Sequence, residues 1–131
     1  MMGSEIVSTA VGTKVLFENN RIRVWEMSLT SGQSSDMHKH LHDHVIIYGM
    51  PSTVRGVEQG ATTSISQDVD AGFVLYRTVG KDGLKPHRLV NIGHGTSVHY
   101  IVEILGESAS TVTQPYENNG RGRFGEAESL P

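Results

Sequence analysis

Apolar and polar residues alternate along much of the chain between residues 14 and 105. From residue 21 to residue 27 the alternation has a period of two, as expected for a β-strand with one buried face. Short runs of β-branched and aromatic residues recur between clusters of Gly, Asn, Asp and Ser, a pattern typical of antiparallel β proteins. It predicts strands at residues 14–18, 21–29, 37–41, 44–49, 53–59, 62–67, 72–78, 87–92 and 98–105. About nine strands in one small domain favour a sandwich or a barrel.

The predicted strand 21–29 has two different apolar faces. Ile22 and Val24 lie on one face, and Trp25 and Met27 lie on the other. The sequence leaves open which face belongs to the core and which meets a partner strand or a second subunit. Because an exposed edge strand next to the Trp25 face offers a route to association, we expect a homodimer.

Three parts of the chain differ in pattern. Residues 14–105 carry the strand pattern, residues 1–13 form an N-terminal segment, and residues 106–131 form a C-terminal tail without sustained periodicity. Tyr116 and Phe124 are apolar residues through which this tail could dock on the barrel or on a neighbouring subunit. The sequence does not decide whether the tail is docked.

Length and composition exclude several classes of protein. A chain of 131 residues has room for one domain. With 37% hydrophobic residues, 19% charged residues and a net charge of -3, it is neither a disordered polyelectrolyte nor a basic nucleic-acid binder. Glycine-rich phosphate loops, serine-hydrolase elbows and paired glycosidase carboxylates have no counterpart in the sequence. Since there is no cysteine, any metal must be held by imidazole and oxygen ligands.

The first residues carry neither the basic flank nor the apolar run of a signal peptide. The longest apolar stretches are far shorter than the ~18 residues of a membrane span. We therefore expect a cytoplasmic protein with no membrane partner.

Histidine is concentrated in one short segment. Of the seven histidines, His38, His40, His42 and His44 lie within residues 37–44. Residues two apart on a strand point the same way about 6.6 Å apart, so the first two can bind one metal ion at ~2.1 Å. A straight strand would carry His44 roughly 20 Å beyond His38, so the chain must turn near residues 41–43 for His44 to reach the ion. The alternatives are exposed histidines with no common task or a surface patch with adventitious metal affinity.

The order of these residues resembles the first motif of the cupins. Gly32, five residues, His38-x-His40, three residues and His44 precede an apolar strand, and His44 stands where the family has a glutamate. Residues 72–77 and 86–91 resemble the strands of the second cupin motif. The resemblance, to small single-domain bacterial cupins, spans roughly residues 14–105. It implies an all-β, cupin-type antiparallel β-barrel, a double-stranded β-helix with jelly-roll topology.

The resemblance also implies a metal site. His38, His40 and His87 are carried over as ligands, and His44 offers a different but competent donor at the glutamate position. Replacing the glutamate removes one negative charge, so a bound metal should be a stronger Lewis acid. The three-histidine cupins, such as the thiol and diketone dioxygenases, are similar in this respect. They favour one divalent ion, Fe(II), with Zn, Ni, Mn, Co or Cu as the other metals compatible with imidazole.

Glu103 lies in the apolar run of residues 100–105, where a buried carboxylate must be paired or used. It either accepts a proton near the metal or forms an ion pair with Arg23, Arg77 or Arg88.

Further polar residues are candidates for contact with a ligand. Tyr48 is a core or cavity residue whose phenol could take part in catalysis together with Glu103. The arginines could recognise a substrate carboxylate, and a histidine on the last strand could lie near the metal. The candidates for substrate binding are Arg77, Arg88, Tyr76 and His99.

The resemblance to three-histidine cupins implies a dioxygenase-like enzyme that oxidises a small chelating substrate, with a carbonyl or a carboxylate, in an O2-dependent reaction. Two other classes stay open. One is a lyase or isomerase in which a metal without redox chemistry polarises a carbonyl. The other is a metal-bearing binding or sensor module without turnover, since the fold does not dictate the chemistry. A nucleic-acid partner is not expected.

Overall fold

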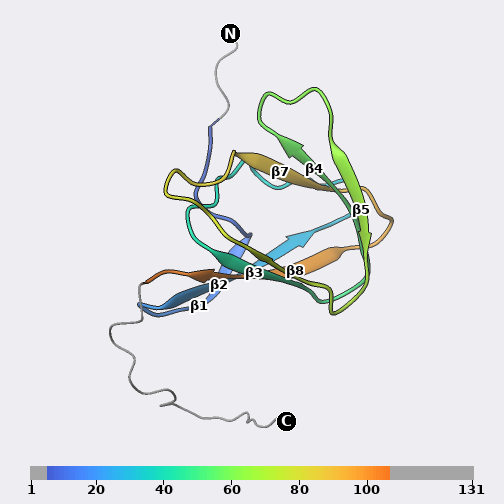
Figure 1. Cartoon of the computed structure of the whole chain (residues 1–131). Helices are drawn as coiled ribbons and strands as arrows, with labels where there is room; N and C mark the ends of the chain where they lie inside the picture. The colour runs from blue at the N-terminus through green and yellow to red at the C-terminus, as the bar shows by residue number, and fades with distance from the viewer. Residues whose placement is uncertain (1–5, 107–131) are drawn as a thin grey trace.

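The computed structural model describes residues 6–106 and consists of two antiparallel β-sheets that face each other (Figure 1). The five-stranded sheet has the order β1-β2-β8-β3-β6 and the three-stranded sheet the order β5-β4-β7. The strands are β1 (Lys14–Glu18), β2 (Ile22–Leu29), β3 (His44–Tyr48), β4 (Ser52–Glu58), β5 (Ile65–Val69), β6 (Val74–Arg77), β7 (His87–Asn91) and β8 (Ser97–Ile104). The prediction of an all-β antiparallel fold is confirmed. The residues expected to form the tail, apart from Gly106, lie outside the described residues.

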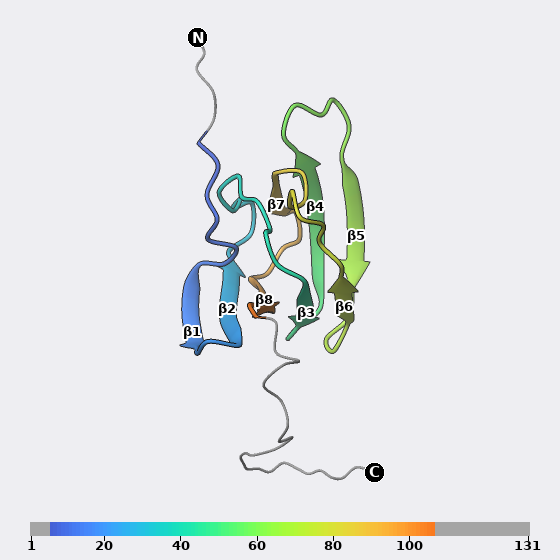
Figure 2. The ribbon, with the colours of Figure 1, turned by 60° about the vertical axis from the view of Figure 1, so that its left-hand side comes forward.

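Residues 6–106 contain no helix that could span a membrane. Figure 2 shows the second view of the sheets, with β1 and β2 on one side and β4 and β5 on the other. The predicted strand 62–67 is β5, which begins three residues later, at Ile65. The turn before it is longer than the pattern indicates, because Gly60 has a φ of 77° and the Ala61 N–H donates to the Glu58 carbonyl.

The predicted strand 37–41 is wrong as a regular strand. Residues 35–38 run along β7. The Ser35 N–H donates to the Leu89 carbonyl at 2.8 Å, and the His38 N–H donates to the His87 carbonyl at 2.8 Å. The Leu89 N–H, however, donates to Ser35 Oγ rather than to a backbone carbonyl. Because a side chain takes the place of a backbone partner, the segment is extended and paired but joined to its neighbours only by isolated bridges.

The core lies between the two sheets. Its buried apolar residues are Val11, Met27, Leu29, Ile46, Tyr48, Val69 and Ile101. Trp25 packs against this cluster, so the face of β2 that carries Trp25 and Met27 is the inner one. This corrects the suggestion that the Trp25 face meets a second subunit. Val11 is 1% exposed, so part of the segment before residue 14 belongs to the core.

The outer face of the five-stranded sheet is also apolar. In register across the strands, Phe17 pairs with Val24, Val24 with Val102 and Val45 with Tyr76. Phe17 and Tyr76 are 53% and 55% exposed. The homodimer stays a prediction, and this face, not the Trp25 face, is the apolar surface that it could use.

Candidate metal centre

Three histidines meet between the sheets. His38, His40 and His87 each offer a ring nitrogen, and these atoms lie within 4.8 Å of one another. The backbones of His38 and His87 exchange two hydrogen bonds, of 2.8 and 2.9 Å. The His40 carbonyl accepts a third from Leu84 at 3.0 Å. Backbone pairing therefore fixes the main chain at the three histidines, and the structure brings together three of the four predicted ligands.

The hydrogen bonds of the rings suit metal ligation. His38 Nδ1 lies 2.9 Å from the Asp36 carbonyl oxygen, so Nδ1–H donates and Nε2 keeps its lone pair. His40 Nδ1 is buried and has no hydrogen-bond partner among residues 6–106. A buried polar atom without a partner costs free energy, and a divalent ion bound by these rings would offset that cost. The residues present therefore fit a metal.

The electrostatics favour the same conclusion. Burial, together with the nearby histidines and Arg77, lowers the pKa of His40 to about 2 and that of His87 to about 4. Burial also lowers the pKa of His38. The three imidazoles are therefore neutral at pH 7, which is the form that binds metal.

His44 lies beside this group but is not one of the three. The turn expected near residues 41–43 is present: the chain bends at His42, whose carbonyl oxygen lies 2.8 Å from His44 Nδ1. The His44 ring is fully buried and stacks on the His40 ring, with centroids 4.1 Å apart. Its Nε2 has no partner within residues 6–106. The four-ligand site stays a prediction, while the group of three stands without it.

We expect His44→Ala to weaken metal binding by about 10- to 100-fold, the range for groups that orient a ligand, and to leave a measurable site. His44→Glu should keep the metal, because a carboxylate offers a hard donor with nearly the same reach. Titration of the metal-free variants by calorimetry measures both. If His44→Ala binds the metal as weakly as His40→Ala does, His44 is an indispensable ligand and the three histidines alone do not make up the site.

A row of polar side chains crosses the inner face of the five-stranded sheet beside this group. Register pairs join Glu18 to Arg23, Arg23 to Glu103, Glu103 to His44, and His44 to Arg77. Arg23 contacts both carboxylates at 3.2 Å. The row connects an edge strand, through two ion pairs, to the histidine that stacks on His40.

Glu103 is held within this row. It is 2% exposed, and its Oε1 accepts hydrogen bonds from Trp25 Nε1 at 2.7 Å and from Arg23 Nη1 at 3.2 Å. Of the alternatives open for Glu103, the ion pair with Arg23 is therefore the one formed. The residue does not line the cavity at the three histidines, so its role as a proton acceptor stays a prediction without support from its position.

A cavity of about 40 Å³ adjoins the three histidines. Tyr48 and His99, both predicted site residues, line it, with ring centroids 4.6 Å apart. Burial raises the pKa of Tyr48, so its phenol stays protonated and can donate a hydrogen bond. Burial lowers the pKa of His99 to about 4. The remaining wall is apolar and consists of Val11, Met27, Ile46, Leu89 and Ile101.

Two other predicted residues lie elsewhere. Tyr76 points to the outer face, where its hydroxyl donates to Asp43 Oδ2 at 3.1 Å. Arg88 stands between His87 and Leu89, which both line the cavity, so strand alternation directs Arg88 to the opposite face. The structure therefore brings neither Tyr76 nor Arg88 to the histidine cavity.

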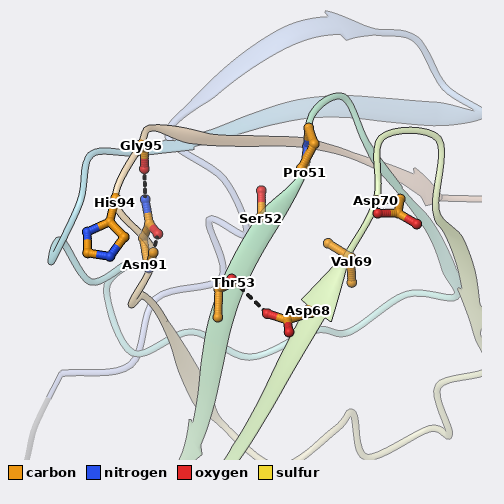
Figure 3. Close-up of a pocket in the computed structure, with 10 residues that line it drawn as sticks. Pro51, Ser52, Thr53, Asp68, Val69, Asp70, Asn91, His94 and Gly95 are labelled. Atoms are coloured by element: carbon orange, nitrogen blue, oxygen red, sulfur yellow. Dashed lines mark hydrogen bonds between the residues drawn. The ribbon is translucent and has the colours of Figure 1, made fainter.

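A second cavity, of about 270 Å³, lies at the other end of β7 (Figure 3). The Asn91 amide donates to the Leu29 and Gly95 carbonyls at 2.9 and 2.8 Å, and Thr53 Oγ1 donates to Asp68 at 2.7 Å. Its residues come from separate segments without a shared motif, so no sequence pattern indicates this cavity. They are Pro51, Ser52, Thr53, Asp68, Val69, Asp70, Asn91, Gly93, His94 and Gly95.

Comparison with known proteins identifies the fold. No protein-family model and no curated protein sequence matches the chain. Among solved structures, a cupin domain from Bordetella pertussis has a TM-score of 0.61 at 20% identity, covering 77% of this chain and 98% of that one. A conserved protein with a double-stranded β-helix domain from Klebsiella pneumoniae has a TM-score of 0.54 at 19% identity, covering 72% and 76%. The protein therefore has the cupin fold, the double-stranded β-helix expected from its histidine motif.

Proposed function

We propose that this protein is a mononuclear, metal-dependent enzyme that acts on a small chelating substrate with a carbonyl or carboxylate. The preferred chemistry is an Fe(II)- and O2-dependent oxidation of the dioxygenase type. The observation that carries the proposal is the group of three buried imidazoles, His38, His40 and His87, with donor atoms within 4.8 Å of one another. Three protein ligands leave coordination positions of a six-coordinate ion for substrate and O2.

The donor set narrows the choice of metal. Imidazole suits Zn, Cu, Fe and Ni, whereas Mg and Ca prefer carboxylate, carbonyl and water oxygens. The resemblance of the motif to three-histidine dioxygenases favours Fe(II) within this group. A bound ion would supply Lewis acidity, and iron would add redox chemistry with O2.

The protein's own side chains would position the substrate and exclude water. Tyr48 would donate a hydrogen bond from its protonated phenol to a substrate oxygen, and the apolar wall would keep bulk water from the site. The cavity volume of about 40 Å³ is well below the roughly 300–1,000 Å³ of common small-molecule pockets. The substrate is therefore small, or the wall side chains move to admit it.

The decisive experiment is metal analysis of protein purified anaerobically without a histidine tag, followed by O2-uptake measurements with small keto acids, diketones and thiols. We expect about one iron per chain and O2 consumption that depends on substrate. Zinc without O2 uptake would instead favour a non-redox lyase or isomerase. A protein that binds no metal would contradict the proposal and leave a binding module without turnover.

A further inference from the structure

We propose that Arg77 anchors the carboxylate of a small organic acid beside the three histidines. The inference rests on the proposed function in that it names the class of substrate, but its key contact is with the protein and not with the metal. It starts from the polar row on the inner face of the five-stranded sheet, which ends at Arg77.

Each charged member of this row before Arg77 has an opposite charge in contact, because Arg23 contacts Glu18 and Glu103 at 3.2 Å. Arg77 follows His44 in register on β6, the edge strand of the sheet. Within residues 6–106 no salt bridge and no side-chain hydrogen bond reaches its guanidinium. A cation therefore closes the row with no anion beside it.

Arg77 is also half-buried, which makes a lone charge costly. Taking an ion out of water is unfavourable unless a counter-ion compensates, and burial accordingly lowers the pKa of Arg77. Its positive charge acts on the rings that line the cavity and lowers the pKa of His38, His87 and His99. Arg77 is not among the residues that line the cavity of about 40 Å³, but its charge reaches the histidines of that cavity and would act on an anionic group held beside them.

The position of Arg77 links it to the metal donors. It pairs across the strands with His44, and the His44 ring stacks on His40. One side chain thus separates the guanidinium from a candidate ligand. A substrate that binds a metal at the three histidines can place an anionic group within reach of Arg77.

The chemistry of the site selects a carboxylate. The histidine group contributes no negative charge, and the carboxylate of Glu103 is engaged by Arg23 and Trp25. A divalent ion and Arg77 would together create a strong positive potential, which an anionic ligand would neutralise. The planar guanidinium binds a carboxylate through two parallel hydrogen bonds.

The test compares pyruvate with its neutral isostere, pyruvamide. Binding is measured by NMR titration or calorimetry on the zinc-loaded protein, which cannot turn over with O2, and on the metal-free protein. We expect Arg77→Gln to weaken pyruvate binding by about 10- to 100-fold, as expected for loss of a charge-assisted hydrogen-bonded pair. The affinity for pyruvamide should not change in Arg77→Gln. The pyruvate affinity of Arg77→Lys should lie between those of wild type and Arg77→Gln. Arg55→Gln, at an exposed position on β4, is the matched control.

Two further measurements separate this inference from the proposed function. Calorimetry should show that Arg77→Gln binds zinc at least as tightly as wild type, because the variant removes a positive charge near the ion, and circular dichroism should confirm that both are folded. If Arg77→Gln binds pyruvate as tightly as wild type, or if wild type does not prefer pyruvate to pyruvamide, the role of Arg77 is overturned while the metal site stands. If zinc does not bind, the metal-dependent function fails. A pyruvate preference of the metal-free protein that Arg77→Gln abolishes would still support the anchor.

Discussion

Replacing His38 or His40 with alanine should remove most of the bound metal and leave the β-rich circular dichroism spectrum largely unchanged. Each residue supplies one of three donor nitrogens that lie within 4.8 Å of one another. The loss of a direct ligand should exceed the roughly 10- to 100-fold effect of changes that only reorient ligands. The backbone of the segment stays paired, because the hydrogen bonds between His38 and His87 are made by main-chain groups.

The measurement is metal content by elemental analysis after dialysis against a known concentration of the free ion. His94→Ala is the control, since His94 is exposed and lines the second cavity instead. We expect the control to keep full occupancy. Full occupancy in both His38→Ala and His40→Ala would show that the metal, if any, binds elsewhere.

The strands and the histidine pair could be predicted because both depend on local sequence. Alternation with a period of two reflects which face of a strand is buried, and it gave all eight strands of the described residues with small shifts at their ends. The spacing of His38 and His40 puts both rings on the same side of any extended segment. Their meeting with His87 followed from the motif, and the structure supplies the physical reason in the bridge between His38 and His87.

Contacts between residues far apart in the chain could not be predicted from the sequence. Trp25 faces inward, and its Nε1 donates to Glu103, 78 residues away. The ion pair of Arg23 with Glu103 spans 80 residues. Such partners depend on which strand lies next to β2, and the alternation of one strand does not contain that information. The irregular segment 37–41 is a similar case, because Ser35 Oγ, and not a backbone carbonyl, accepts the hydrogen bond of the Leu89 N–H on β7.

The position of His44 shows the same limit at the site itself. Its place in the motif predicts a fourth ligand, and the turn at His42 brings its ring against His40. Stacking and ligation both need a ring close to His40, so spacing alone does not separate them. The difference lies in the direction of the ring nitrogens, which the His42 carbonyl sets through its contact with Nδ1.

Lowering the pH from 7.5 to about 4.5 should strongly destabilise the metal-free protein. Burial lowers the pKa of His40 from 6.5 to about 2 and that of His99 from 6.5 to about 4. The unfolded chain, with a histidine pKa near 6.5, therefore takes up protons before the folded protein does. The stabilisation is complete above pH 6.5 and is lost progressively as the pH falls toward the folded-state values.

The size of the effect follows from the shifts. The shift of His99 alone corresponds to about 3 kcal/mol, and His40, His87, His38 and His44 shift in the same direction. Because a typical domain is stable by roughly 5–15 kcal/mol, we expect unfolding within this pH range. A bound divalent ion should move the transition to lower pH, since it competes with protons for the same ring nitrogens.

Urea denaturation at pH 7.5, 6.0, 5.0 and 4.5, with and without zinc, measures the free energy of unfolding directly. A His99→Gln variant should show a shallower pH dependence than wild type, because one buried titrating group has been removed. His94→Ala, which changes an exposed histidine, should keep the slope of wild type. A free energy of unfolding that stays constant down to pH 4.5 would mean that the rings are open to water. The histidines would then not be buried in their neutral form.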